Sequence, residues 1–197
     1  MLAQAGAIPG GRGWTFEPKL DGFRCLVCTH DDFRARSRRG WDMTPLLPSS
    51  APLSPRACSS TGSWWRSTKP GGRTSICSRR GCCIADPAIV VTLFVFDVLA
   101  VEGLPTTMQP YSARRALLEQ LELETERLRL VATFEDGEAL FAAVCDRGLE
   151  GVVAKRDCDP YRAGERLWVK TKNRATARFA EEREGVCRRA ARIAGPR

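Results

Sequence analysis

One lysine near the start of the chain lies in a short frame of charged residues and glycine that could make it a nucleophile. The segment EPKLDGFR spans residues 17–24. A lysine amine ordinarily has a pKa near ~10.4, so catalytic use at neutral pH requires desolvation or neighbouring cations. Arg24 can hold a phosphate, and Gly22 permits a sharp turn. Glu17 would point to the same side of a strand as Lys19, which is predicted to carry covalent chemistry.

Two lysines and a glutamate later in the chain could support such chemistry. WVKTK, residues 168–172, places Lys170 and Lys172 on one face of an expected strand. Glu150, in LEGVVAKR at 149–156, is a hard oxygen ligand suited to magnesium. Attack on a nucleotide phosphate needs such cations to neutralise charge. Taken alone, the two lysines could equally form a solvated strand face, and Glu150 with Gly151 would by default be a helix end and turn.

Five segments resemble, in the same order, motifs of the covalent nucleotidyltransferases, most closely ATP-dependent DNA ligases of the bacterial end-joining type. EPKLDGFR resembles the KxDGxR signature, and SRRG at 37–40 resembles the SRxG element. LFVFDVL at 93–99 is similar to the strand whose phenylalanine stacks on adenine. The segments 149–156 and 168–172 resemble the EGVVxK and WxKxK motifs. The order of the five favours this family over a chance match.

The resemblance implies a role for each residue. Lys19 would attack the α-phosphate of ATP and form lysyl-AMP, while Glu150 would lie near Mg²⁺. Taken alone, Phe96 in its apolar run is more typical of a buried core residue than of an adenine-stacking one. The expected nucleotide-binding residues are Glu17, Arg24, Arg38, Phe96, Lys170 and Lys172.

Residues 49–88 have a different composition from their flanks, rich in Ser, Arg, Cys, Pro and Gly and without strand or helix periodicity. The family carries an LDGEL motif in this interval, whose glutamate binds the ribose. If residues 61–79 are back-translated with GC-rich codons and read two nucleotides later, they begin GELVALDEAGRPDFHLLS. We therefore interpret 49–88 as an aberrant, frame-shifted segment in which Ser63 replaces that glutamate. We expect its strands to be missing.

Composition narrows the class of protein. The 197 residues carry a net charge of +8 and a pI near 9.3, which favours a polyanionic partner such as DNA or nucleotide. No apolar run long enough to span a membrane and no charged-then-apolar leader is evident, so we expect a cytoplasmic protein that does not engage membranes. Nine cysteines, an odd number, do not suggest a disulfide framework.

Periodicity predicts an α+β fold. We expect two short strands within 14–47 with a turn at 30–32, and Lys19 where the first of them is entered. Further strands are expected at 89–99, 128–132, 151–155 and 167–172, and helices at 111–122 and 136–147. Ser112 is a candidate cap for the first helix, and Gly148 would end the second. The resemblance implies an ATP-grasp-like adenylation domain over 1–173 with antiparallel sheets and flanking helices. A basic tail or truncated linker would follow at 174–197, without the C-terminal OB-fold.

The resulting prediction is the adenylation domain of an ATP-dependent DNA ligase that acts on nicked or broken duplexes in repair and recombination. A separate OB-fold or end-joining protein would be a further partner. Two alternatives remain open. One is a catalytically impaired remnant that only binds nucleotide or DNA, and the other is an RNA ligase or capping-type nucleotidyltransferase.

Overall fold

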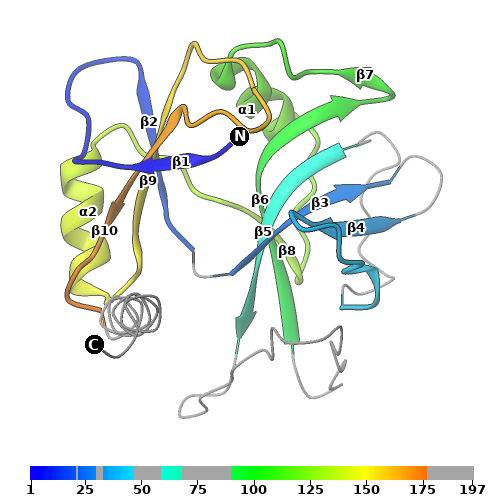
Figure 1. Ribbon diagram of the computed structural model, residues 1–197, viewed down its shortest axis with the longest axis horizontal. Helices are drawn as coiled ribbons and strands as arrows, with labels where there is room; N and C mark the ends of the chain where they lie inside the picture. Colours follow the sequence, from blue (N-terminus) through cyan, green and yellow to red (C-terminus); the bar gives the residue numbers. More distant parts are fainter. Residues whose placement is uncertain (21, 30–32, 47–58, 68–89, 177–197) are drawn as a thin grey trace, which may run out of the picture. The chain divides into compact units, whose positions relative to one another are not determined.

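The computed structural model describes residues 1–20, 22–29, 33–46, 59–67 and 90–176 (Figure 1). The chain divides into two compact units. Unit 1 comprises Met1–Leu20, Ala132–Arg156 and Ala163–Arg197, and unit 2 comprises Asp21–Val131 and Asp157–Arg162.

Unit 1 is built on a four-stranded sheet. Its order is β1 (Ala3–Ala5), β10 (Trp168–Lys172), β9 (Gly151–Arg156) and β2 (Trp14–Pro18). Helix α2 (Gly137–Asp146) packs on this sheet, where Phe16 and Val152 join Leu140 and Val144 of the helix in one apolar core. The helix begins where predicted, because the Asp136 side chain accepts a hydrogen bond from Ala139 N.

Unit 2 is built on a six-stranded sheet (Figure 1). Five strands follow the order β4 (Arg34–Ser37), β3 (Phe23–Cys28), β5 (Ser59–Ser67), β6 (Val90–Val101) and β7 (Leu104–Pro105). Strand β8 (Leu128–Leu130) pairs with β6 in parallel. Helix α1 (Tyr111–Gln120) packs on β6, and Val95, Val98 and Leu118 lie in the shared core. A 3-10 turn, Thr44–Leu46, follows β4.

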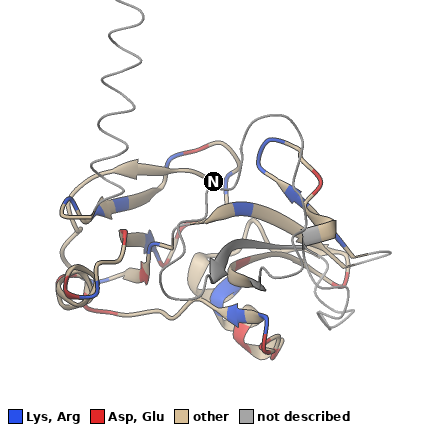
Figure 2. Ribbon diagram, turned by 90° about the horizontal axis from the view of Figure 1, so that it is seen from below, with Lys and Arg blue, Asp and Glu red and all other residues tan. Residues whose placement is uncertain are grey.

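The α+β class is confirmed, and both predicted helices are present. The sheets are not wholly antiparallel, since β1 pairs with β10 and β6 with β8 in parallel. In the described part of the chain no helix is long and apolar enough to cross a membrane. Helix α1 carries both basic and acidic residues along its ribbon (Figure 2), and Arg115 Nε lies 2.7 Å from Glu119 Oε1.

Three predictions about local structure are wrong. Residues 14–47 form three strands, β2, β3 and β4, and Lys19 follows β2 instead of opening a strand. Ser112 lies inside α1, whose N-cap is Pro110 with no side-chain cap. Within 49–88, residues 59–67 do form a strand, β5, which pairs with both β3 and β6. The rest of that segment, the turn at 30–32 and most of the tail lie outside the described residues.

Candidate active site

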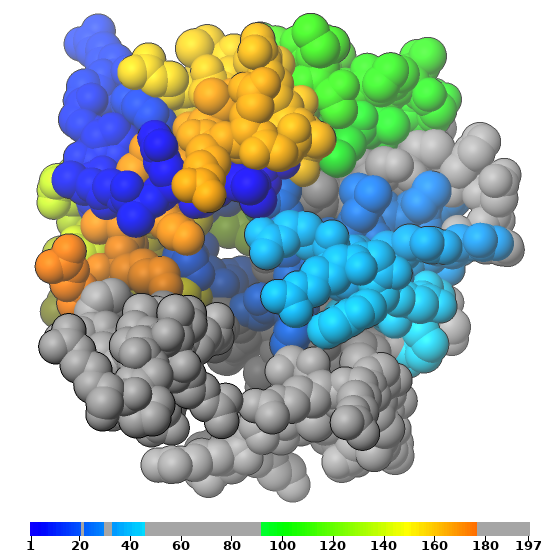
Figure 3. All heavy atoms as spheres, viewed as in Figure 1, coloured from blue at the N-terminus to red at the C-terminus, as the bar shows by residue number. Residues whose placement is uncertain are grey.

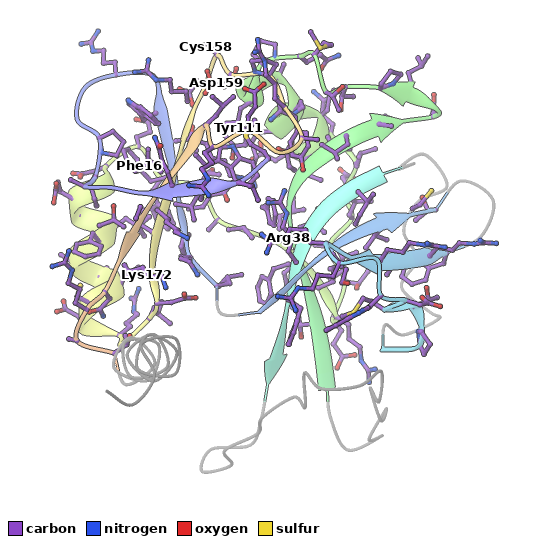
Figure 4. The ribbon with its side chains drawn as sticks, in the orientation of Figure 1. Phe16, Arg38, Tyr111, Cys158, Asp159 and Lys172 are labelled. Atoms are coloured by element: carbon purple, nitrogen blue, oxygen red, sulfur yellow. The ribbon has the colours of Figure 1, made fainter. Side chains whose placement is uncertain are left out.

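Three residues from separate motifs meet in unit 1. Lys19 Nζ lies 2.5 Å from Glu150 Oε1, and Lys172 Nζ lies 3.9 Å from the same oxygen. Lys19 follows β2, Glu150 precedes β9, and Lys172 ends β10, where Figure 4 labels it. Because these three strands are neighbours in one sheet, residues far apart in the sequence converge on one carboxylate. Each of these side chains keeps part of its surface accessible.

The backbone around Glu150 holds this cluster in register. Lys19 N donates to Gly151 O at 2.8 Å, and Asn173 N donates to Glu150 O at 2.9 Å. Gly151 has φ of +153°, and a Cβ there would lie 2.1 Å from Thr171 O. Only glycine allows β9 and β10 to approach this closely, so the glycine of the motif is a packing requirement of the site.

The second oxygen of Glu150 is a candidate ligand for a cation. Glu150 Oε2 is buried and has no hydrogen-bond partner. Buried polar atoms are normally satisfied, so an orphaned carboxylate oxygen favours a bound cation. No group of three or more His, Cys, Asp or Glu side chains gathers among the described residues. The arrangement therefore fits Mg²⁺, which often takes one or two carboxylates and completes its shell with substrate phosphates and water.

Glu17 takes part in a buried ion pair. Lys155 Nζ donates to Glu17 Oε1 at 2.5 Å, and the two side chains are 1% and 5% exposed. The Lys155 ammonium also lies 4.6 Å from the centroid of the Trp168 ring. Lys155 is not among the site residues that the sequence predicts. Lys155 lies in the same sequence motif as Glu150, and this is a signal that it could belong to the site. That Glu17 is its partner follows only from the pairing of β2 with β9.

Lys170 lines a hollow of about 830 Å³ in unit 1 together with Lys172. Ala5, Phe141 and Cys145 form part of its largely apolar wall, whereas Lys19 and Glu150 do not line it. The contact between Lys19 and Glu150 therefore lies outside the lining of this hollow, and Lys172 belongs to both.

Unit 2 holds the remaining predicted residues. The Arg24 guanidinium lies 5.4 Å from the centroid of the Phe96 ring, and Arg38 N donates to Arg24 O at 3.3 Å. Arg38, which Figure 4 labels, is exposed. Its segment reaches the surface on the face seen in Figure 3. Phe96 is only 7% exposed. The structure therefore brings Arg24, Arg38 and Phe96 together.

A β-bulge explains the direction of Phe96. Thr61 pairs with Asp97 and Gly62 pairs with Val95, so Phe96 is the extra residue of β6. Bulges re-aim side chains, and this one lets Val95 and Val98 both enter the core while Phe96 lies beside Arg24. No pattern in the sequence predicts the bulge, because a bulge depends on the register of the partner strand.

Sequence reasoning misses two further groups in unit 2. Arg24 Nη2 donates to Tyr161 Oη at 2.8 Å, although the loop around Tyr161 carries no recognisable chemical motif. Arg114 and Asp97 form a fully buried ion pair, with Arg114 Nε 2.8 Å from Asp97 Oδ1. Both contacts join residues far apart in the sequence, which no local pattern reveals.

Comparisons with known proteins identify the family of the chain. The family described as "ATP dependent DNA ligase domain" matches residues 73–172. The multifunctional non-homologous end joining DNA repair protein LigD of Mycobacterium tuberculosis is 32% identical over 188 residues, covering 88% of this chain and 24% of that protein. The chain thus spans about a quarter of the length of this curated relative.

Solved structures show the same fold. The ligase domain of M. tuberculosis LigD has a TM-score of 0.70 and 31% identity, over 87% of this chain and 58% of that one. Mycobacterial DNA ligase D complexed with ATP and MES also has a TM-score of 0.70, with 30% identity over 87% of this chain and 59% of that one. The family match covers more than half of the sequence and includes Glu150, Lys170 and Lys172. By sequence and by fold, the chain belongs to the ATP-dependent DNA ligase domain family.

Proposed function

We propose that this chain forms a lysyl-AMP intermediate at Lys19 from ATP, as the first step in sealing nicked or broken DNA. The observation that carries the proposal is the 2.5 Å contact between Lys19 Nζ and Glu150 Oε1, with Lys172 Nζ 3.9 Å from the same oxygen. The contact holds the Lys19 amine at a fixed position near a second cation, which can neutralise charge on a phosphate during the attack.

The proposed reaction exchanges one bond at phosphorus for another. A bond forms from Lys19 Nζ to the α-phosphorus of ATP, and the bond from that phosphorus to its bridging oxygen breaks. Pyrophosphate leaves with the electron pair, and the amine gives up a proton. Lys172 and Lys170 would neutralise charge on the α-phosphate, as the resemblance to the WxKxK motif implies. Glu150 would hold Mg²⁺, which supplies further charge neutralisation when bound.

The resemblance also implies roles for three residues of unit 2. Arg24 would contact a phosphate, Arg38 the sugar or the DNA, and Phe96 the adenine. The Phe96 ring lies in a cation–π contact with Arg24. Adenine would therefore use a part of the ring that the guanidinium does not cover.

Incubation with α-labelled ATP and Mg²⁺ tests the proposal. We expect acid-labile covalent AMP on the unaltered chain and none on Lys19→Ala. Lys19→Arg is the matched control, since it keeps a cation for Glu150 but removes the amine nucleophile, and it should also stay unlabelled. Label that persists on either variant would refute the assignment of Lys19.

The acceptor is tested in a second step. The labelled chain is mixed with a 5′-phosphorylated nicked DNA duplex or with the matching RNA duplex. We expect AMP to move to the DNA 5′-phosphate. Transfer to RNA alone would favour the RNA ligase alternative, and a chain that binds ATP but never becomes labelled would be the impaired remnant.

A further inference from the structure

The segment Asp157–Arg162 follows a path fixed by hydrogen bonds within unit 2. Ser112 N donates to Asp157 O at 3.0 Å, and Tyr161 N donates to Thr107 O at 2.7 Å. Arg114 Nη1 donates to Asp159 O at 3.1 Å. These three bonds, to α1 and the residues before it, hold the backbone at Asp157, at Asp159 and at Tyr161 itself.

Arg114 is the rigid centre of this arrangement. Its side chain is fully buried and binds Asp97 through two parallel hydrogen bonds, Nε to Oδ1 at 2.8 Å and Nη2 to Oδ2 at 3.0 Å. Its guanidinium also lies 5.9 Å from the centroid of the Tyr161 ring and 5.8 Å from that of Tyr111. A bidentate buried pair has one favourable geometry, so Arg114 can fix the position of the Tyr161 ring.

The Tyr161 hydroxyl faces Arg24. Arg24 Nη2 donates to Tyr161 Oη at 2.8 Å, and the same guanidinium lies beside the Phe96 ring. Burial raises the pKa of Tyr161, while the positive charge of Arg24 opposes that rise. The hydroxyl therefore remains neutral at physiological pH and accepts the hydrogen bond.

We infer that Tyr161, held by Arg114, is a positioning residue that fixes the Arg24 guanidinium beside Phe96 for contact with a nucleotide phosphate. This inference rests on the proposed function. A free arginine side chain loses on the order of 2 kcal/mol of rotamer entropy when it is ordered. Because Tyr161 orders Arg24 before the nucleotide arrives, binding avoids part of that cost.

A double-mutant cycle tests the inference. Affinity for α,β-methylene-ATP, which cannot be cleaved at the α-phosphate, is measured by calorimetry for the unaltered chain, Tyr161→Phe, Arg24→Met and the double variant. Phenylalanine keeps the ring against Arg114 and removes only the hydroxyl. We expect Tyr161→Phe to weaken binding about tenfold, the loss of one hydrogen bond to a charged group. The double variant should bind no more weakly than Arg24→Met alone.

A purely structural role for Tyr161 gives a different result. If the hydroxyl only supports the loop, Tyr161→Phe will weaken binding by the same factor with or without Arg24, and the inference is overturned. Unchanged affinity in Tyr161→Phe overturns it as well. In labelling kinetics we expect the KM for ATP to rise about tenfold while kcat stays within about threefold.

The proposed function and this inference can fail separately. If the unaltered chain binds the analogue but no AMP joins Lys19 from ATP, the proposed function falls and the binding cycle still decides the role of Tyr161. If AMP joins Lys19 and the cycle shows no coupling, the function stands and the positioning role is refuted.

Discussion

Replacement of Gly151 by alanine would test whether β9 and β10 approach as closely as the structure shows. The new Cβ would lie 2.1 Å from Thr171 O and 3.0 Å from Lys172 Cα. A carbon–oxygen contact normally needs about 3.3 Å, so the strands must separate by roughly 1 Å or the backbone must change. The φ of +153° is also unfavourable for alanine.

The expected cost follows from three terms. A strained backbone costs about 1–3 kcal/mol, overpacking costs about 1–3 kcal/mol, and a weakened inter-strand hydrogen bond costs about 1 kcal/mol. Relaxation relieves part of the sum, so we expect Gly151→Ala to lower the free energy of unfolding by about 3–5 kcal/mol. Lys19 labelling should fall about 10- to 100-fold even where the variant is folded, because Lys19 N is bonded to Gly151 O.

Urea unfolding at neutral pH measures the free energy of unfolding, and incubation with α-labelled ATP measures the rate at which Lys19 is labelled. Gly164→Ala is the matched control in the same unit, since Gly164 has φ of +86° but no heavy atom within 4 Å of the position that a Cβ would take. We expect that control to lose only about 1 kcal/mol and to keep its labelling rate. Equal losses in the two variants would show that the close approach of β9 and β10 is not real.

Three further predictions concern other parts of the chain. Lys155→Met should cost about 3–5 kcal/mol in urea unfolding because it removes the cation from buried Glu17, and adding Glu17→Leu should recover most of that loss. Burial raises the pKa of Cys25 to about 12 from 9.0, so its contribution to stability is full below pH 9 and declines by about 1.4 kcal/mol per pH unit as the pH rises towards 12. Cys25→Ala should remove this part of the decline in stability at alkaline pH. Urea unfolding of both proteins from pH 8 to 11 gives the slope of stability against pH, and equal slopes would show that the thiol is not buried. Ser63 pairs with Arg24 across β5 and β3. If 49–88 has lost a ribose-binding glutamate, Ser63→Glu should strengthen ATP binding several-fold, as measured by calorimetry. Unchanged affinity would count against that hypothesis.

Local signals in the sequence predict only part of the fold. The apolar run of β6 and the periodicity of α2 follow from residue types alone, and so do the strand that follows Glu150 and the strand that carries Lys172. The composition of β5 does not predict a strand. Its serines and glycine are poor strand formers, but hydrogen bonds to β3 and β6 on both sides outweigh that weak intrinsic preference.

The site is predictable as a set of residues but not as an arrangement. Motif order suggests that Lys19, Glu150 and Lys172 act together, whereas their meeting at one carboxylate oxygen depends on the strand order of unit 1. The link from Tyr161 to Arg24 has no local signal, because 137 positions separate the two residues in the chain. Contacts of this kind follow from topology and not from periodicity.

The pairing of β2 with β9 sets the time at which the surroundings of Lys19 can form during protein synthesis. Glu17 and its partner Lys155 are separated by 138 positions in the chain. At about 5–20 residues per second, a ribosome needs roughly 7–28 s to make the intervening segment. Lys19 is therefore made well before Glu150 and reaches it only when β9 is also being made. A nascent chain interrupted before β9 would carry Lys19 without the carboxylate that it contacts in the folded chain.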